Sequence, residues 1–177
     1  MAATDENRRK GAASARPESS SGDNQRGRMV ARKQAHWVRQ AAAAVGAVFL
    51  LVGIAGFIPG ITSNYDELSF AGHESGAELL GLFQVSILHN IVHLLFGVAG
   101  LALARSVKGA TQYLIWGGVI YLVLWFYGLV IDHDSGANFV PVNDADNWLH
   151  LGLGVLMVLL GMIGRRAEIA PGSRVEG

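Results

Sequence analysis

The chain has 177 residues, of which 51% are hydrophobic and only 16% are charged. Soluble domains carry about 25% charged residues, so this composition points away from a soluble protein and toward a membrane protein. Cysteine is absent, which excludes disulfides, thiolate metal sites and thiol nucleophiles, and the formal net charge is zero.

Residues 1–35 are polar and contain almost no large apolar side chains. Such a segment cannot bury enough apolar surface to offset the entropy of ordering, so we expect a disordered, basic cytoplasmic tail. Its positive charge suits contact with anionic lipid headgroups. Nucleic acid is not an expected partner, because stacking aromatic residues are lacking. Met29 is an alternative start of the natural protein.

Four apolar runs without charged residues follow, each long enough for a transmembrane helix of about 20 residues. We expect a membrane domain over residues 36–166 and a short cytoplasmic tail over 167–177. The predicted helices cover about 38–58, 80–104, 111–131 and 148–164. A signal peptide is the alternative interpretation of the first run, but the long basic segment before it and the lack of an A-x-A-like cleavage site favour a permanent anchor.

Lys and Arg are confined to three places along the chain: before the first run, in the loop between the second and third runs, and after the fourth run. Acidic residues occupy the other two loops. The positive-inside rule therefore places both termini in the cytoplasm and the acidic loops outside a bacterial plasma membrane. Within the first outer loop, Ser75 and Glu78 have the spacing of a capping box, which predicts that the second helix begins near Gly76.

A sequence motif recurs in the second and fourth runs. Asn90-x-x-His93-Leu94-x-x-Gly97-Val98 matches Asn147-x-x-His150-Leu151-x-x-Gly154-Val155, and Phe49 and Gly56 match Tyr121 and Gly128 more weakly. The fold prediction is therefore an all-α bundle of four transmembrane helices, built from two helical hairpins repeated in parallel orientation.

Helical spacing places the polar residues of this motif on one side of each helix. His89, Asn90 and His93 share a side with Gly97, and Asn147 and His150 share a side with Gly154. Small residues mark close contacts between membrane helices, so both motifs should face the interior of the bundle.

Four interpretations of these five candidate site residues stay open. The amides and imidazoles satisfy one another and the neighbouring carbonyls, and so fix how the hairpins dock; or they bind a small molecule, a lipid or a proton. His93 and His150 from two helices would also suit haem or another redox cofactor. Finally, His89, His93 and His150 offer a transition-metal site without a carboxylate. We predict no cofactor, with haem as the alternative.

The outer loops contain a second group of candidate ligands for a hard cation. Its members are His73, Glu74, Glu78, Asp132, His133, Asp134, Asp144 and Asp146. They are scattered and lack EF-hand spacing, which favours solvated residues that cap helices. The chain also lacks the G-x-S-x-G, Walker A and HExxH motifs.

Three blocks of sequence resemble a known family: "GFIPGIT" (56–62), residues 75–105, and "NWLHLGLGVLMV" (147–158). The chain is similar to small four-helix actinobacterial membrane proteins described as domain of unknown function 4383. The resemblance covers roughly residues 36–166 and implies the fold and the membrane location, without a reaction, cofactor or site.

The sequence thus favours a non-enzymatic, multi-pass membrane protein with inward-facing Asn-x-x-His pairs. A redox protein that binds haem or interacts with quinone through His93 and His150 is the alternative. Expected partners are the lipid bilayer and, through small-xxx-small spacing, a second copy or another membrane protein.

Overall fold

The computed structural model describes residues 19–169, and most of these residues are helical. The helices are α2 (Ser19–Ala55), α3 (Ile87–Leu103), α4 (Val107–Val130) and α5 (Asp144–Ile169). The loop between α2 and α3 adds a 3-10 turn, η1 (Tyr65–Glu67), and a small antiparallel sheet of strands β1 (Thr62–Ser63), β2 (Glu78–Leu79) and β3 (Phe83–Gln84) in the order β1-β2-β3.

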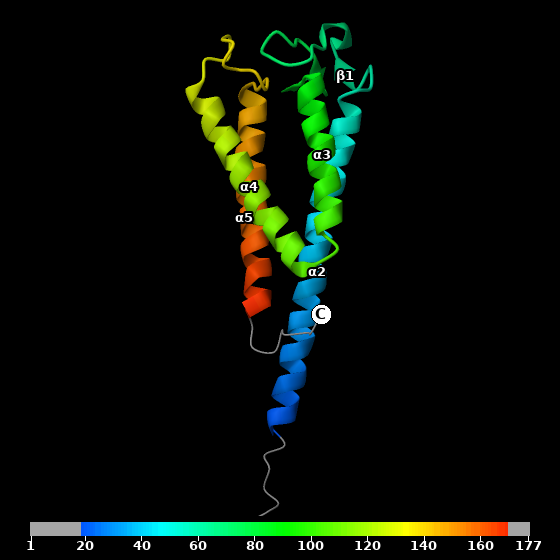
Figure 1. Cartoon of the computed structure of the whole chain (residues 1–177), viewed down its shortest axis with the longest axis vertical. Coiled ribbons are helices and arrows are strands. Elements are labelled where there is room, and N and C mark those ends of the chain that lie inside the picture. Colours follow the sequence, from blue (N-terminus) through cyan, green and yellow to red (C-terminus); the bar gives the residue numbers. More distant parts are fainter. Residues whose placement is uncertain (1–18, 170–177) are drawn as a thin grey trace, which may run out of the picture.

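The helices form two hairpins that meet at one end. Helix α2 packs mainly on α3, and α4 packs mainly on α5. Figure 1 shows the two pairs approaching each other near the turn between α3 and α4 and separating toward the long loops. Phe49, Tyr113, Tyr121 and Met157 belong to the core cluster between the hairpins.

Glycine lets the helices of each hairpin approach closely. A β-carbon added to Gly46 would lie 2.9 Å from the backbone nitrogen of Leu101, and one added to Gly118 would lie 2.8 Å from the carbonyl oxygen of Gly154. Both distances are too short for a real side chain, so backbone contacts backbone at these two points.

Helix α3 begins later than the sequence predicts. Its N-cap is Ser86, whose hydroxyl accepts a hydrogen bond from the His89 N–H at 3.1 Å. The predicted capping box does not form, because Ser75 Oγ instead donates to the Val85 carbonyl oxygen and Glu78 belongs to β2. A turn with positive φ at Leu80 (57°) and Gly81 (67°) separates β2 from β3 and prevents a helix from starting at residue 80.

The tail expected over residues 1–35 overlaps with α2, because residues 19–35 continue this helix. Arg, Gln, Lys, Met and Ala dominate the second half of this segment and have good helix propensity, so the membrane helix extends beyond its apolar part. Residues 1–18 lie outside the described residues. At the other end, α2 stops at Ala55 rather than at residue 58, and Thr62 Oγ1 donates to the Ala55 carbonyl oxygen at 3.1 Å.

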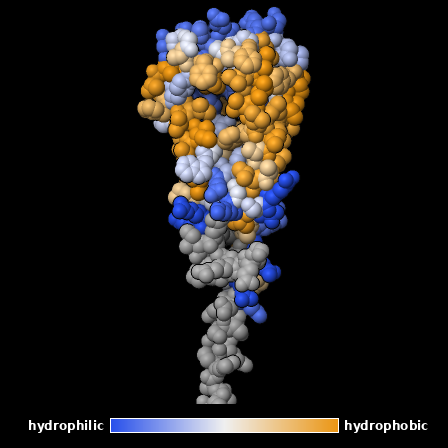
Figure 2. Space-filling view, in the orientation of Figure 1, coloured by the Kyte–Doolittle hydropathy of each residue, from blue (hydrophilic) through white to orange (hydrophobic). Residues whose placement is uncertain are grey.

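The helices carry the apolar surface that a membrane requires. Gln25–Ala55, Val107–Val130 and Asp144–Arg166 are long and apolar enough to cross a bilayer, and α3 is a shorter apolar helix of 17 residues. Figure 2 shows a band of hydrophobic side chains around the helices, with hydrophilic side chains at the loop end. The predicted tail over 167–177 begins within α5, which runs to Ile169; residues 170–177 lie outside the described residues.

Candidate functional site

The candidate site residues occupy the first turns of two helices. Ser86 caps α3 and so fixes His89, Asn90 and His93 in its first two turns. Helix α5 starts with a capping box between Asn143 and Asp146. The Asp146 N–H donates to Asn143 Oδ1 at 2.9 Å, and the Asn143 N–H donates to Asp146 Oδ2 at 3.1 Å. This arrangement places Asn147 and His150 next to Asp146 at the same end of the bundle.

Each asparagine of the repeated motif lies against a glycine of the neighbouring helix. A β-carbon on Gly56 would overlap with the side-chain oxygen of Asn90, and one on Gly128 would overlap with the side-chain oxygen of Asn147. The two asparagines are 1% and 6% exposed. Each hairpin therefore buries an amide in a space that only glycine leaves open.

The histidines of the two hairpins are joined through aromatic rings. His93 lies 5.6 Å from Phe49 and His150 lies 5.2 Å from Tyr121, measured between ring centroids. Phe49 and Tyr121 in turn lie 5.3 Å apart. His89 stacks on His93 with a centroid distance of 4.6 Å. A continuous row of rings thus runs from α3 across the bundle axis to α5.

In the part of the chain that the structure describes, His93 Nδ1 bonds to the neighbouring His89 carbonyl oxygen, but no hydrogen bond joins the amides and imidazoles of the two motifs to one another. Among the described residues, several buried polar atoms of these motifs have no hydrogen-bond partner: Asn90 Oδ1 and Nδ2, Asn147 Oδ1, His89 Nδ1 and His150 Nδ1. The polar groups of the two hairpins are too far apart to bond to each other. Each asparagine packs on a glycine of its own hairpin, and aromatic rings lie between His93 and His150. Buried polar groups without partners cost free energy, so they need an explanation other than docking of the hairpins.

A cavity of about 100 Å³ lies between the two hairpins and under the β2–β3 turn. Apolar side chains make most of its wall, among them Val52, Leu79, Val85, Leu149 and Leu153. Five polar side chains also line it: His89, His93, Tyr121, Asp146 and His150. An apolar cavity with a few convergent polar groups is the usual form of a site for a small molecule.

The hydrogen bond of His93 fixes the role of its ring nitrogens. His93 Nδ1 lies 3.0 Å from the His89 carbonyl oxygen. Because a carbonyl oxygen can only accept, Nδ1 carries the hydrogen, and in the neutral ring Nε2 is a hydrogen-bond acceptor. His93 therefore offers an acceptor to a ligand in the cavity.

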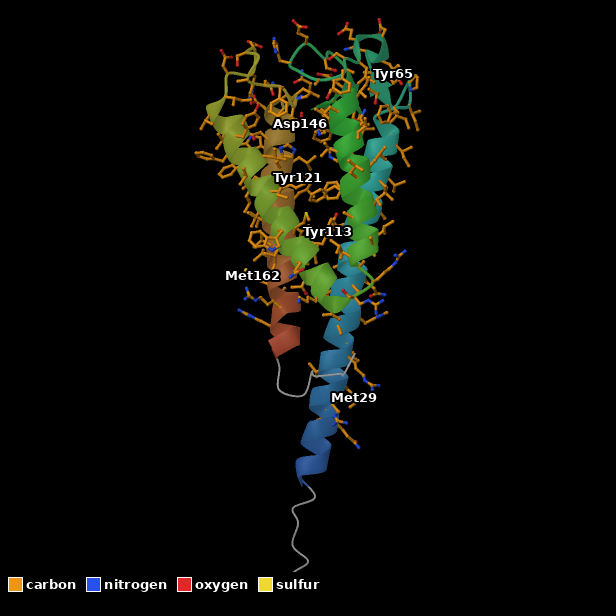
Figure 3. All side chains as sticks on the ribbon, viewed as in Figure 1. Met29, Tyr65, Tyr113, Tyr121, Asp146 and Met162 are labelled. Atoms are coloured by element: carbon orange, nitrogen blue, oxygen red, sulfur yellow. The ribbon has the colours of Figure 1, made fainter. Side chains whose placement is uncertain are left out.

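Asp146 was expected only as one of the scattered outer acids, and the structure gives it a central position. It is 3% exposed, and its Oδ2 accepts hydrogen bonds from the N–H groups of Gln84 (3.0 Å) and Asn143 (3.1 Å). Figure 3 shows Asp146 at the start of α5, with Tyr121 and Tyr113 further along between the hairpins. The signal in the sequence was its spacing, because Asp146 stands one helical turn before His150.

The outer-loop candidates for a metal do not gather into a site. Within residues 19–169, no group of three or more His, Asp or Glu side chains is placed to hold a metal ion. Asp132 Oδ1 instead accepts a hydrogen bond from the Asp134 N–H, and His133 Nε2 bonds to the Gly128 carbonyl oxygen. His73 is half-buried and Glu74 is exposed. His89, His93 and His150 line the cavity without forming a metal-ligand set.

The long apolar helices, with a mostly apolar cavity between them, fit an integral membrane protein. The family model described as domain of unknown function (DUF4383) matches residues 39–163. The chain therefore belongs to this family, as the sequence blocks predicted. A search of curated proteins and a search of solved structures found no match.

Proposed function

We propose that this protein crosses the bacterial plasma membrane four times, with both termini in the cytoplasm, and binds a small molecule in the cavity between its hairpins. The observation that carries the proposal is the cavity of about 100 Å³, whose wall includes one histidine with an unpartnered buried Nδ1 atom from each hairpin, His89 and His150. Ionisable groups inside a membrane are functional candidates because their burial is costly.

The position of basic residues supports the four-span topology. All Lys and Arg precede Gln40, follow Gly164, or lie in the turn between α3 and α4 (Arg105) and the first turn of α4 (Lys108). Beside the turn between α3 and α4, Arg39 Nε donates to the Ala104 carbonyl oxygen at 3.0 Å and so ties the start of the apolar part of α2 to the end of α3. Helix α3 has 17 residues, at the lower end of the range of about 17–25 for a membrane span.

Corresponding contacts support a duplicated hairpin. An offset of 72 residues, from Gly56 to Gly128, relates α2 to α4, and an offset of 57 residues, from Asn90 to Asn147, relates α3 to α5. With these offsets, four contacts of the first hairpin correspond to four of the second: Gly46–Gly97 to Gly118–Gly154, Leu50–Gly97 to Leu122–Gly154, Phe49–His93 to Tyr121–His150, and Gly56–Asn90 to Gly128–Asn147. We propose that the cavity lies between two copies of one ancestral hairpin.

The size of the cavity bears on the redox alternative. Pockets for drug-sized ligands occupy about 300–1,000 Å³. At about 100 Å³, the space beside His93 and His150 is too small for haem, so we do not propose haem as a ligand. The ring of a quinone is nearer in size, but the acceptor at His93 Nε2 does not match its carbonyl oxygens.

A ligand-detected binding experiment tests the proposal. The purified full chain in detergent is mixed with 4-fluorophenol, a ring of the right size with one hydroxyl donor, and binding is followed by fluorine NMR line broadening. The variant Leu153→Trp is designed to fill the cavity, because Leu153 lines it. Leu156→Trp is the matched control, because Leu156 is 49% exposed on the same helix.

We expect broadening with the wild-type protein and with Leu156→Trp, and its loss with Leu153→Trp. Equal broadening with all three proteins would mean that the probe binds the micelle or the outer surface, and the proposal would be wrong.

A further inference from the structure

The side chain of Asp146 places a buried carboxyl group in the cavity wall. This residue is 3% exposed. No Lys or Arg occurs between Gln40 and Ala104 or between Gly109 and Gly164, so the sequence supplies no basic residue in the elements around it. A buried carboxylate without a cationic partner is costly, and a cation bound beside it would remove part of that cost.

Two polar groups of the cavity, Asp146 and His93, favour a hydrogen-bond donor as ligand. Oδ2 of Asp146 accepts from two backbone N–H groups, which use two of about four acceptor positions of a carboxylate. His93 adds an acceptor at Nε2, because its Nδ1 donates to the His89 carbonyl oxygen. A ligand with N–H donors satisfies both groups, whereas a ligand with only acceptors satisfies neither.

Aromatic side chains complete a wall that suits an organic cation. Tyr121 and Phe83 both line the cavity. The face of an aromatic ring attracts a cation within about 6 Å of its centre, and the apolar part of the wall accepts alkyl groups. The volume of about 100 Å³ limits the part of the ligand that enters to a few carbon atoms around the charged nitrogen.

The loops at the cavity end add a long-range attraction for cations. Seven further acidic residues lie in these two loops or at the start of α5: Asp66, Glu67, Glu74, Glu78, Asp132, Asp134 and Asp144. Leu80 and Leu149 line the cavity and are 65% and 42% exposed, which marks the mouth between the β2–β3 turn and α5. A field of one sign near a mouth raises the local concentration of oppositely charged ligands.

We infer that the cavity binds a small, lipophilic organic ammonium ion, whose N–H groups contact Asp146 and His93 and whose alkyl groups lie against the apolar wall. The inference rests on the proposed function, because it names the ligand class of the same cavity. It requires binding alone and no chemical reaction.

Two probes of nearly equal size, one charged and one neutral, separate the effect of charge on binding from the effect of shape. The full chain in detergent is titrated with tert-butylammonium or with tert-butanol, and saturation-transfer NMR of the tert-butyl protons gives the dissociation constants. We expect tert-butylammonium to bind at least tenfold more tightly than tert-butanol. Equal affinities, tighter binding of the alcohol, or no specific signal from tert-butylammonium would overturn the inference.

Two neighbouring aspartates provide a matched pair of variants. Asp146→Asn keeps an oxygen that accepts from Gln84 and Asn143 but loses the charge. It should therefore weaken the binding of tert-butylammonium at least tenfold and change the affinity for tert-butanol less than twofold. Asp144 is exposed on the same turn, and Asp144→Asn should leave both affinities unchanged. Equal effects of the two variants on tert-butylammonium would contradict the assignment of Asp146.

A cavity-filling variant keeps the test informative if Asp146→Asn does not fold. Leu153→Trp leaves the capping box of Asp146 intact and should abolish the specific signal of both probes. If 4-fluorophenol and tert-butanol bind but tert-butylammonium has no advantage, the cation inference fails and the proposed function stands. If none of the three probes binds, both fail.

Discussion

Phe49 and Tyr121 meet at the axis between the hairpins, with ring centroids 5.3 Å apart. Each ring contacts a histidine of its own hairpin, His93 for Phe49 and His150 for Tyr121. The first hairpin thus places a purely apolar ring where the second places a ring with a hydroxyl group. Of the two, only Tyr121 lines the cavity, so the polar side of the site belongs mainly to the second hairpin.

The aromatic contact across the axis should couple the two hairpins energetically. Aromatic pairs contribute about 0.5–1.5 kcal/mol beyond burial, so a double-mutant cycle of Phe49→Leu and Tyr121→Leu should give a coupling free energy in this range. The stability is measured by thermal unfolding in detergent. His93→Ala and His150→Ala should each destabilise the protein but couple more weakly, because rings lie between them. A stronger coupling of the histidines would show that they meet directly.

The two glycines beneath the asparagines should not tolerate a methyl group. Gly56→Ala and Gly128→Ala each force a β-carbon into a buried asparagine, and overpacking of this kind costs about 1–3 kcal/mol. Gly152→Ala is the control, because no atom lies within 4 Å of the added β-carbon and alanine favours the helix. Thermal unfolding midpoints should fall for the first two variants and not for the third. Similar midpoints for all three would contradict the packing of Asn90 and Asn147 described above.

Asp146 should hold the β2–β3 turn to α5. Asp146→Ala removes the acceptor of the Gln84 and Asn143 N–H groups, and the loss of an N-cap interaction costs about 0.5–2 kcal/mol. Hydrogen exchange at the Gln84 amide should become faster in Asp146→Ala, while Asp146→Asn should retain most of the protection. Asp144→Ala, on an exposed residue of the same helix, should leave Gln84 unchanged. Unchanged exchange in Asp146→Ala would show that this contact does not anchor the turn.

The proposed topology makes a prediction about chemical accessibility. Because the chain has no native cysteine, single cysteines are specific labels. In intact cells, a membrane-impermeant maleimide should modify Asp66→Cys and Gly136→Cys, which lie in the two outer loops. Arg166→Cys, at the opposite end, should react only after the cells are opened. Labelling of Arg166→Cys in intact cells would contradict the cytoplasmic position of that end.

The sequence predicted the parts of the fold that depend on periodicity. The apolar runs and the glycine stripes indicated which faces of the helices meet, because membrane helices approach at small residues. Buried Gly97 and Gly154 lie on the faces that the spacing of the Asn-x-x-His motifs indicated. The start of α3 could not be predicted in this way, since residues 79–88 are mostly apolar both in the strands and in the helix.

The sequence indicated candidate site residues, but it could not predict their contacts. Spacing places His93 and His150 at similar depth, but it cannot show that Phe49 and Tyr121 lie between them. Nor can it show which polar atoms have partners, because that depends on the tertiary packing of both hairpins. The sequence shows that Asp146 and His150 are one helical turn apart, but only the structure shows that both side chains line the same cavity.

The most direct test of the central claim is to locate a bound probe. Crystals of the full chain soaked with 4-bromophenol would give an anomalous bromine peak. The account predicts a peak in the cavity beside His93, Tyr121 and His150 in the wild-type protein, and no such peak in Leu153→Trp. Bromine found only on the lipid-facing surface of the helices, with an empty cavity, would contradict a small-molecule site between the hairpins.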